Sequence, residues 1–360
     1  MRKIICISIF LISSLFSYSQ DYSFSQFDLN MMYSNPAFAG YKNNNRILLH
    51  RRNQWSGIAE KFNSNILELN LNGKIRGSGL GRGEISWAGG LYIIANPENS
   101  VFTEYNIGII PWTFHFQLPR NFFISMGMQN VISFHSLDWS NLLFSDQIND
   151  FGPTGNETSA SLPAYYKSQN WFDPSFGFII TKHSLFQNRS NQISSIGLAF
   201  HHLNRVVESF YNNQTESSRL PIKTTIHAEH NGGVPSFISH SFSSWKIFAR
   251  HEQLGKNKVM QKNEIGFSTT LASQIPLELG TIYRIGRRIS ENNLLMSEAL
   301  IPLIRMRLKT TRDIGMEISY SYDFTSSELH NTNTISTHEI NLNFYFIKRK
   351  TRTCPANDNW

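Results

Sequence analysis

The sequence contains very little cysteine. Of 360 residues, only Cys6 and Cys354 are cysteines. Cys6 lies in an apolar run at the N-terminus, and Cys354 lies in a polar stretch near the C-terminus. If the N-terminal run is removed, one thiol remains, and one thiol cannot form an internal disulfide. The sequence therefore excludes a fold held together by disulfides.

Long apolar runs and an excess of one charge are also missing. No apolar run of 18 residues follows the N-terminal region, which excludes a helical membrane span. The formal net charge is +7, and no Lys/Arg cluster is interleaved with aromatic residues, so nothing indicates a nucleic-acid partner. The mean hydropathy of −0.29 does not exclude transmembrane β-strands, because their residues alternate and average to an unremarkable value.

Signatures of catalysis or of metal binding are missing as well. The glycine-rich stretch 77–83 is not followed by a helical pattern, so it does not indicate a phosphate-binding loop. No Gly-x-Ser-x-Gly elbow is present. Adjacent His201 and His202 would face opposite sides of a strand, and so would His227 and His230. The sequence therefore predicts no enzyme, no cofactor and no metal site.

The N-terminus has the pattern of an export signal. Arg2 and Lys3 precede the apolar run 4–16, and small residues follow in 17–20. This order of basic, apolar and small residues is typical of a secretory signal peptide. We therefore expect residues 1–20 to be cleaved during export.

Residues 313–324 alternate strictly between apolar and polar or small side chains. In residues 313–324, "DIGMEISYSYDF", every second side chain is apolar or aromatic, and the side chains between are polar or small. A period of two separates the two sets onto opposite faces of a strand. Twelve residues extend about 40 Å at ~3.3 Å each, which is long for a soluble strand. Such a strand suits a lipid on one side and water on the other.

Similar runs continue along the chain and predict about fourteen strands. They are residues 44–55, 63–75, 84–95, 103–117, 121–134, 171–183, 193–204, 221–230, 236–250, 260–273, 276–288, 299–309, 312–325 and 334–347. Short connections alternate with longer ones, and the longest is 135–170. This pattern is typical of an up-and-down antiparallel β-barrel in the outer membrane, with short periplasmic turns and longer extracellular loops. A soluble β-sandwich remains the alternative.

These predictions divide the chain into four parts. The barrel covers residues 44–347, and both termini are expected in the periplasm. A periplasmic N-terminal segment covers residues 21–43, and a periplasmic C-terminal tail covers 348–360. The polar faces of the strands direct charges into the lumen, because an Arg that faces lipid at the midplane costs roughly 2–4 kcal/mol. The predicted lumen-facing charges are Arg284, Arg305, Arg307, Lys309, Glu317 and Glu339.

Two segments outside the strands are candidates for partner binding. The first is 21–43, with the turn-like residues Asn35, Pro36 and Phe38; it is equally consistent with a plug or cap on the barrel. The second is the 135–170 connection, whose aromatic residues are costly to expose to water without a use, although they are equally consistent with packing on the barrel mouth. These aromatic residues, with one at the following strand, are Trp139, Tyr165, Tyr166 and Trp171.

Several short motifs, in this order and spacing, resemble the PorP/SprF family. "FSQF" (24–27) precedes "NPAFAG" (35–40), and "RRNQW" (51–55) follows. "SYSYDFTSSEL" (319–329) and "STHEINLNFYF" (336–346) are similar to the family's last two strands, and "RTCPAN" (352–357) is similar to its Cys-Pro tail. Thr337, between Ser336 and His338, departs from the usual pattern.

The resemblance implies an outer-membrane barrel of the type IX secretion system of Bacteroidetes. It implies partners among the secretion components and a large secreted or surface protein, such as an adhesin of gliding motility, together with outer-membrane lipid. It implies no catalysis and no cofactor. The expected function is therefore secretion or surface anchoring of that partner. The alternative is a passive, weakly anion-selective pore whose inward cations attract anions.

Overall fold

The computed structural model contains a closed antiparallel barrel of fourteen strands. The structure describes residues 21–41, 45–55, 62–75, 85–96, 102–118, 121–137, 143–149, 152–159, 168–186, 190–208, 219–234, 239, 241–255, 260–287, 295–309, 314–326 and 337–346. The barrel strands are β1 (Asn45–Gln54), β2 (Phe62–Ile75), β3 (Ile85–Asn96), β4 (Phe102–Leu118), β5 (Phe122–Leu137), β8 (Ser168–Phe186), β9 (Ser190–His201), β10 (Lys223–Gly233), β11 (Phe242–Leu254), β12 (Met260–Leu271), β13 (Leu277–Arg287), β14 (Leu295–Lys309), β15 (Ile314–Thr325) and β16 (Thr337–Phe346).

Each strand pairs with its neighbour in the chain, and β1 closes the barrel against β16. This confirms the predicted up-and-down topology and all fourteen alternating runs, with ends that differ by a few residues. β5 and β8 are longer than predicted at the end where they approach the 138–167 connection. There Ser136 still pairs with Ser168, although the apolar alternation has already stopped.

The barrel is apolar outside and polar inside. In β15 the burial alternates strictly: Glu317, Ser319, Ser321 and Asp323 are buried, while Phe324 is 54% exposed. Large apolar side chains are exposed on all sides of the wall, because the outer face meets lipid rather than water. Closure leaves no unpaired strand edge, which a bilayer requires. The soluble β-sandwich considered as an alternative is wrong.

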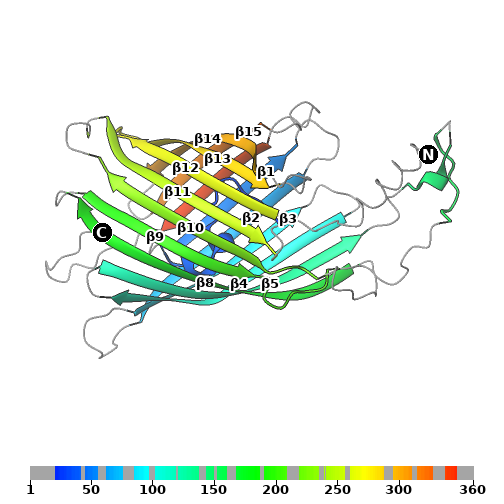
Figure 1. Cartoon of the computed structure of the whole chain (residues 1–360), viewed down its shortest axis with the longest axis horizontal. Helices are drawn as coiled ribbons and strands as arrows, with labels where there is room; N and C mark the ends of the chain where they lie inside the picture. The colour runs from blue at the N-terminus through cyan, green and yellow to red at the C-terminus, as the bar shows by residue number, and fades with distance from the viewer. Residues whose placement is uncertain are drawn as a thin grey trace.

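The two ends of the barrel differ in the length of their connections. At the end where β1 finishes and β16 begins, the connections include residues 138–167 and 202–222. At the other end, where β1 begins and β16 finishes, they include residues 119–121 and 187–189. We call these the loop end and the turn end. Figure 1 shows the barrel from the side, with its strands tilted across the view.

The loop end also carries the small elements of the longest connection. These are η4 (Ser145–Gln147) and the two-stranded hairpin of β6 (Ile148–Asn149) and β7 (Gly152–Pro153). Asp146 accepts hydrogen bonds from Ser159 N at 2.5 Å and from Thr158 Oγ1 at 3.0 Å. These bonds, first of all the one from the Ser159 backbone, lower the pKa of Asp146. Within the described residues, helices are short, and none has the length and apolar character to cross a membrane.

The N-terminal segment lies inside the barrel. Residues 21–41, which the sequence predicts as part of a periplasmic segment ahead of the barrel, instead line its interior and include α2 (Met31–Ser34) and η1 (Pro36–Phe38). Phe24, Met32 and Ala37 are fully or almost fully buried there. The blue N-terminal part is visible between the strands in Figure 1. These residues lie inside the barrel because polar side chains of the inner wall offer them hydrogen-bond and ion-pair partners. A position beyond the turn end would not offer those partners.

Candidate functional site

The site begins with the path of residues 21–41, which we call the lumen segment. Asp21 lies at the loop end, where its Oδ2 is 2.8 Å from Lys223 Nζ at the first residue of β10. Near the middle, Asn30 contacts His50 of β1. The backbone then turns through α2 and η1, and Gly40 N donates to Asn70 Oδ1 of β2 at 2.9 Å, towards the turn end. The lumen segment therefore runs through the barrel from the loop end to the turn end.

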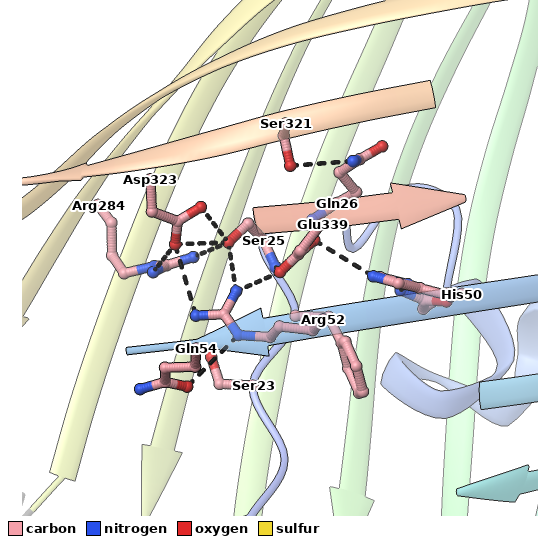
Figure 2. A network of polar contacts seen from close by, with 12 residues as sticks. Ser23, Ser25, Gln26, His50, Arg52, Gln54, Arg284, Ser321, Asp323 and Glu339 are labelled. Atoms are coloured by element: carbon pink, nitrogen blue, oxygen red, sulfur yellow. Dashed lines mark hydrogen bonds and ion pairs between the residues drawn. The ribbon is translucent and has the colours of Figure 1, made fainter. Parts of the chain in front are cut away.

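A carboxylate of the last strand holds the backbone of this segment. Glu339 of β16 accepts Ser25 N at 2.7 Å on one oxygen and Gln26 N at 3.0 Å on the other (Figure 2). Arg52 of β1 forms an ion pair with the same carboxylate. His50 Nε2 is 3.4 Å from it. Since Arg52 and Glu339 are also directly paired in the β-ladder, the segment is fastened at the seam where the barrel closes.

The hydroxyl of Ser25 joins a second set of charges. It donates to Asp323 Oδ2 of β15 at 2.9 Å, and it accepts from Arg52 Nη1 at 2.7 Å and from Arg284 Nη2 of β13 at 2.5 Å (Figure 2). Arg284 also pairs with Asp323 at 2.9 Å and with Glu264 of β12 at 2.8 Å. Ser25 is thus the shared partner of side chains from three strands.

The side chain of the next residue, Gln26, is bound by hydroxyls rather than charges. Gln26 Nε2 donates to Ser321 Oγ at 2.9 Å, and Ser319 Oγ donates to Gln26 Oε1 at 2.7 Å. Both serines lie on the inner face of β15. Phe27 packs edge-on against Phe248, and the guanidinium of Arg250 lies 4.4 Å from the centre of the Phe27 ring. The "FSQF" sequence is therefore bound residue by residue.

Asp28 forms the centre of a charge cluster closer to the turn end. Its Oδ2 is 2.7 Å from Lys246 Nζ and 3.0 Å from Arg305 Nη2. Arg305 continues to Glu278 at 3.1 Å. Arg307 pairs with Glu278 at 2.8 Å and with Glu317 at 2.7 Å. Arg305 and Arg307 of β14 are thus both paired with carboxylates.

Residues 35–40 are held without charges, on the other side of the lumen. Asn35 Nδ2 lies 3.0 Å from His227 Nε2, and its Oδ1 accepts Ala37 N at 2.9 Å, which caps η1. Thr113 Oγ1 of β4 donates to Pro36 O at 2.9 Å. A Cβ at Gly127 would lie 2.6 Å from Pro36 O, so only glycine allows this approach.

At the loop end, Asp21 is part of a polar mouth cluster with His202, Asp173 and Lys223. His202 follows β9, and its ring lies 3.1 Å from Asp21 and 2.6 Å from Asp173. Burial lowers the pKa of His202, but Asp21 and Asp173 outweigh burial and raise it to about 10. Burial likewise raises the pKa of Asp21, but Lys223 and His202 outweigh it and hold the pKa well below its ordinary value. Asp21 and His202 are therefore both charged at neutral pH.

A cavity remains at the turn end of the lumen. Its volume is about 370 Å³, and Phe38 and Tyr41 of the segment, with Trp245, Arg307 and Tyr345 of the wall, are among its lining residues. No group of three or more His, Cys, Asp or Glu that suits a metal ion occurs among the described residues.

The predicted lumen charges occupy the following places. Arg284, Arg305, Glu317 and Glu339 are buried in ion pairs, and Arg307 is half-buried in two. Lys309 is the last residue of β14, and its side chain lies outside the described residues. Sequence reasoning did not single out Arg52, Arg250 and Asp323, which bind the lumen segment together with them, or Glu264, which pairs with Arg250 and Arg284. They occupy the polar face of their strands, and that face is the signal by which they could have been found.

The predicted partner-binding residues fall into two groups. Asn35, Pro36 and Phe38 are buried against the barrel wall. Trp171 lies on β8 and packs against His135 of β5, with ring centres 4.3 Å apart. Trp139, Tyr165 and Tyr166 lie outside the described residues. The structure brings the first group together inside the lumen and does not bring it near Trp171.

The chain is similar to a known protein family and, in its fold, to solved structures. A family model described as "Type IX secretion system membrane protein PorP/SprF" matches residues 16–344. No curated protein matches the chain. Among solved structures, the β domain of the Bordetella autotransporter BrkA is 8% identical and covers 84% of this chain and 97% of that chain, with a TM-score of 0.39. CdiB from Acinetobacter baumannii is 6% identical and covers 84% of this chain and 60% of that chain, with a TM-score of 0.44.

The match to the family model extends over most of the chain, from the end of the N-terminal apolar run into β16. It includes the lumen segment and the whole of the barrel wall that binds it. The closed barrel, with its apolar outer face, is the form in which β-strands cross a membrane. The chain therefore belongs to the PorP/SprF family of type IX secretion system membrane proteins and is an outer-membrane β-barrel.

Proposed function

We propose that this barrel is a docking and anchoring component for a large protein exported by the type IX secretion system, and that it does not act as a solute channel. The observation that carries the proposal is the occupied lumen. Residues 21–41 lie along its length and are bonded to strands on all sides, including β1, β8, β10 and β16. A barrel built in this way offers a rigid support fixed in the membrane.

The charges of the inner wall also support binding rather than conduction. A weakly anion-selective pore would need the cations of β14 to face moving ions. Arg305 is 2% exposed and is bonded to Asp28 and Glu278, and Arg307 is paired with Glu278 and Glu317. These cations serve the structure of the lumen.

The long connections supply the contact surface in this proposal. They gather at the loop end, where extracellular loops of outer-membrane barrels are found. Binding residues are commonly carried by loops on a rigid scaffold. The 138–167 connection, with the hairpin of β6 and β7, is the longest of them. The partner is expected to be a large secreted or surface protein, such as an adhesin, including one of gliding motility.

Affinity purification from the native outer membrane in mild detergent tests the proposal. We expect one large secreted protein, or secretion-system components, to be recovered in stoichiometric amounts. A matched variant in which a Gly-Ser linker replaces residues 143–159 keeps every barrel strand and should lose the partner. Planar-bilayer recordings of the wild-type barrel should show no steady channels. Recovery of the bare barrel together with open, anion-selective steps would contradict the proposal.

A further inference from the structure

The start of the lumen segment and the end of the last barrel strand, β16, lie at opposite ends of the barrel. β16 finishes at the turn end, where β1 begins: Phe346 pairs with Asn45. Asp21, twenty-four positions before Asn45, lies at the opposite end. The first and last described residues are therefore at opposite ends of the barrel.

Three independent contacts place the start of the segment at the loop end. Asp21 bonds to Lys223, the first residue of β10, and to His202, which follows the last residue of β9. Ser23 Oγ accepts from Lys262 Nζ at 2.7 Å, and Lys262 is near the first residue of β12. All of these strand ends adjoin loop-end connections.

The far end of the segment is fixed as firmly at the turn end. His115 Nε2 lies 2.7 Å from Ala39 O, and Gly40 N donates to Asn70. Both partners lie in the turn-end half of their strands, β4 and β2. Since the short connections of outer-membrane barrels face the periplasm, the turn end is the periplasmic end, and the loop end is the cell surface.

We propose that the N-terminus of the mature protein emerges through the lumen at the cell surface, where the mouth cluster of Asp21, His202, Asp173 and Lys223 holds it. This replaces the expectation that both termini are periplasmic. It makes the start of the mature chain part of the surface that an exported partner meets. The inference takes cleavage after residue 20 from the sequence, and it does not depend on the proposed docking function.

Cysteine labelling on intact cells tests this topology. A Gly-Ser-Gly-Cys insertion directly before Asp21, in a Cys354→Ser background, is treated with a membrane-impermeant maleimide before and after lysis. Two single-cysteine variants calibrate the result: Glu157→Cys at the loop end and Gln274→Cys at the turn end, both at exposed residues. We expect the inserted cysteine to react on intact cells to the same fraction as Glu157→Cys. Labelling only after lysis, as for Gln274→Cys, would overturn the proposal.

The unaltered protein provides a second measurement, which remains valid if the insertion prevents assembly. Intact cells are treated with a membrane-impermeant amine-reactive biotin, and the purified barrel is analysed by mass spectrometry. Lys256, in the loop-end connection between β11 and β12, and Lys348, two positions after β16, are internal references. Modification of the N-terminal peptide together with that of Lys256 supports the proposal. Modification only under conditions that also modify Lys348 contradicts it.

Discussion

The two halves of the inner barrel wall are built on different principles. From β11 through β16 to β1, the wall buries an ionic network, and from β3 to β9 it buries mostly uncharged side chains. The ionic half includes Arg52, Arg250, Glu264, Glu278, Arg284, Arg305, Asp323 and Glu339. The uncharged half includes Tyr92, Ile94, Ile110, Thr113, Ser125, Gln129, Ser175, Ile179, Thr181 and Ser195.

The lumen segment follows this division. Residues 25–28 bind the ionic half through backbone amides, a hydroxyl and the Asp28 carboxylate. Residues 35–40 contact the uncharged half through carbonyls, an amide side chain and close packing. A charged wall orients its ligand by a few strong bonds, whereas an uncharged wall does so by shape. The comparison therefore predicts different penalties for damage on each side.

The largest effect is expected from Glu339→Leu in the ionic half. The change removes one of the two buried carboxylates that pair with Arg52 and leaves two backbone amides without an acceptor, and breaking a buried ion pair costs about 3–5 kcal/mol. We expect severe loss of the folded barrel, measured by thermal unfolding in detergent and by heat-modifiable gel mobility. Ile340→Leu, at a neighbouring residue with 53% exposure on the outer wall, is the control and should leave both readouts unchanged. A stable barrel in the Glu339→Leu variant would contradict the role of Glu339 in holding the backbone of the lumen segment.

A smaller effect is expected from Gly177→Val in the uncharged half. A Cβ at this position would overlap Asn35 Oδ1, so the variant must displace the start of η1. Overpacking of this kind costs about 1–3 kcal/mol. We expect a moderately lowered unfolding temperature and intermittent conductance in planar bilayers, since η1 no longer fills its place. Ile196→Val, which trims an outward side chain of neighbouring β9, should be silent in both assays.

The mouth cluster should respond to pH in a defined direction. His202 has its pKa raised to about 10, so its contribution to stability is complete below pH 6.5 and declines as the pH rises towards 10. Asp21 has a lowered pKa, so its contribution is present above pH 4 and is lost at lower pH. The unfolding temperature of the wild type should exceed that of His202→Gln most at about pH 6, by a few degrees. A difference that does not shrink towards pH 10 would contradict this assignment.

The smallest and sharpest test is a pair of double-mutant cycles. Ser25→Ala removes the donor and Asp323→Ala the acceptor of one hydrogen bond, so their effects on the free energy of unfolding should be non-additive by at least about 0.5 kcal/mol, a typical lower bound for residues in contact. Ser25→Ala and Thr113→Val act on different halves of the wall and on different residues of the segment, so their effects should add within about 0.5 kcal/mol. Equal coupling in both cycles would mean that the two halves act as one unit.

The wall of this barrel could be predicted from sequence because its rule is local. In "DIGMEISYSYDF" the polarity of each residue indicates its face, and the same period recurs in every strand. Prediction was less accurate at some strand ends, such as the start of β11 at the turn end and the ends of β5 and β8 at the loop-end mouth. Ladder pairing continues there through His135 and Gln169, after the lipid no longer imposes alternation.

The content of the lumen could not be predicted because it depends on contacts that no local pattern encodes. Ser25 meets Asp323, and Asn35 meets His227, across most of the chain length. The sequence predicted that charges of β13 to β16 face the lumen. It did not indicate that one of these charges binds the backbone amides of Ser25 and Gln26.

The position of Glu339 has a consequence for biogenesis. The carboxylate that receives the amides of residues 25 and 26 belongs to the last strand to be synthesised, and that strand also closes the barrel against β1. A chain that stops before β16 has neither the seam nor the acceptor, so its first residues have no place to be held. Closure of the barrel and capture of the N-terminal segment therefore depend on the same strand, which only a chain that reaches residue 346 contains.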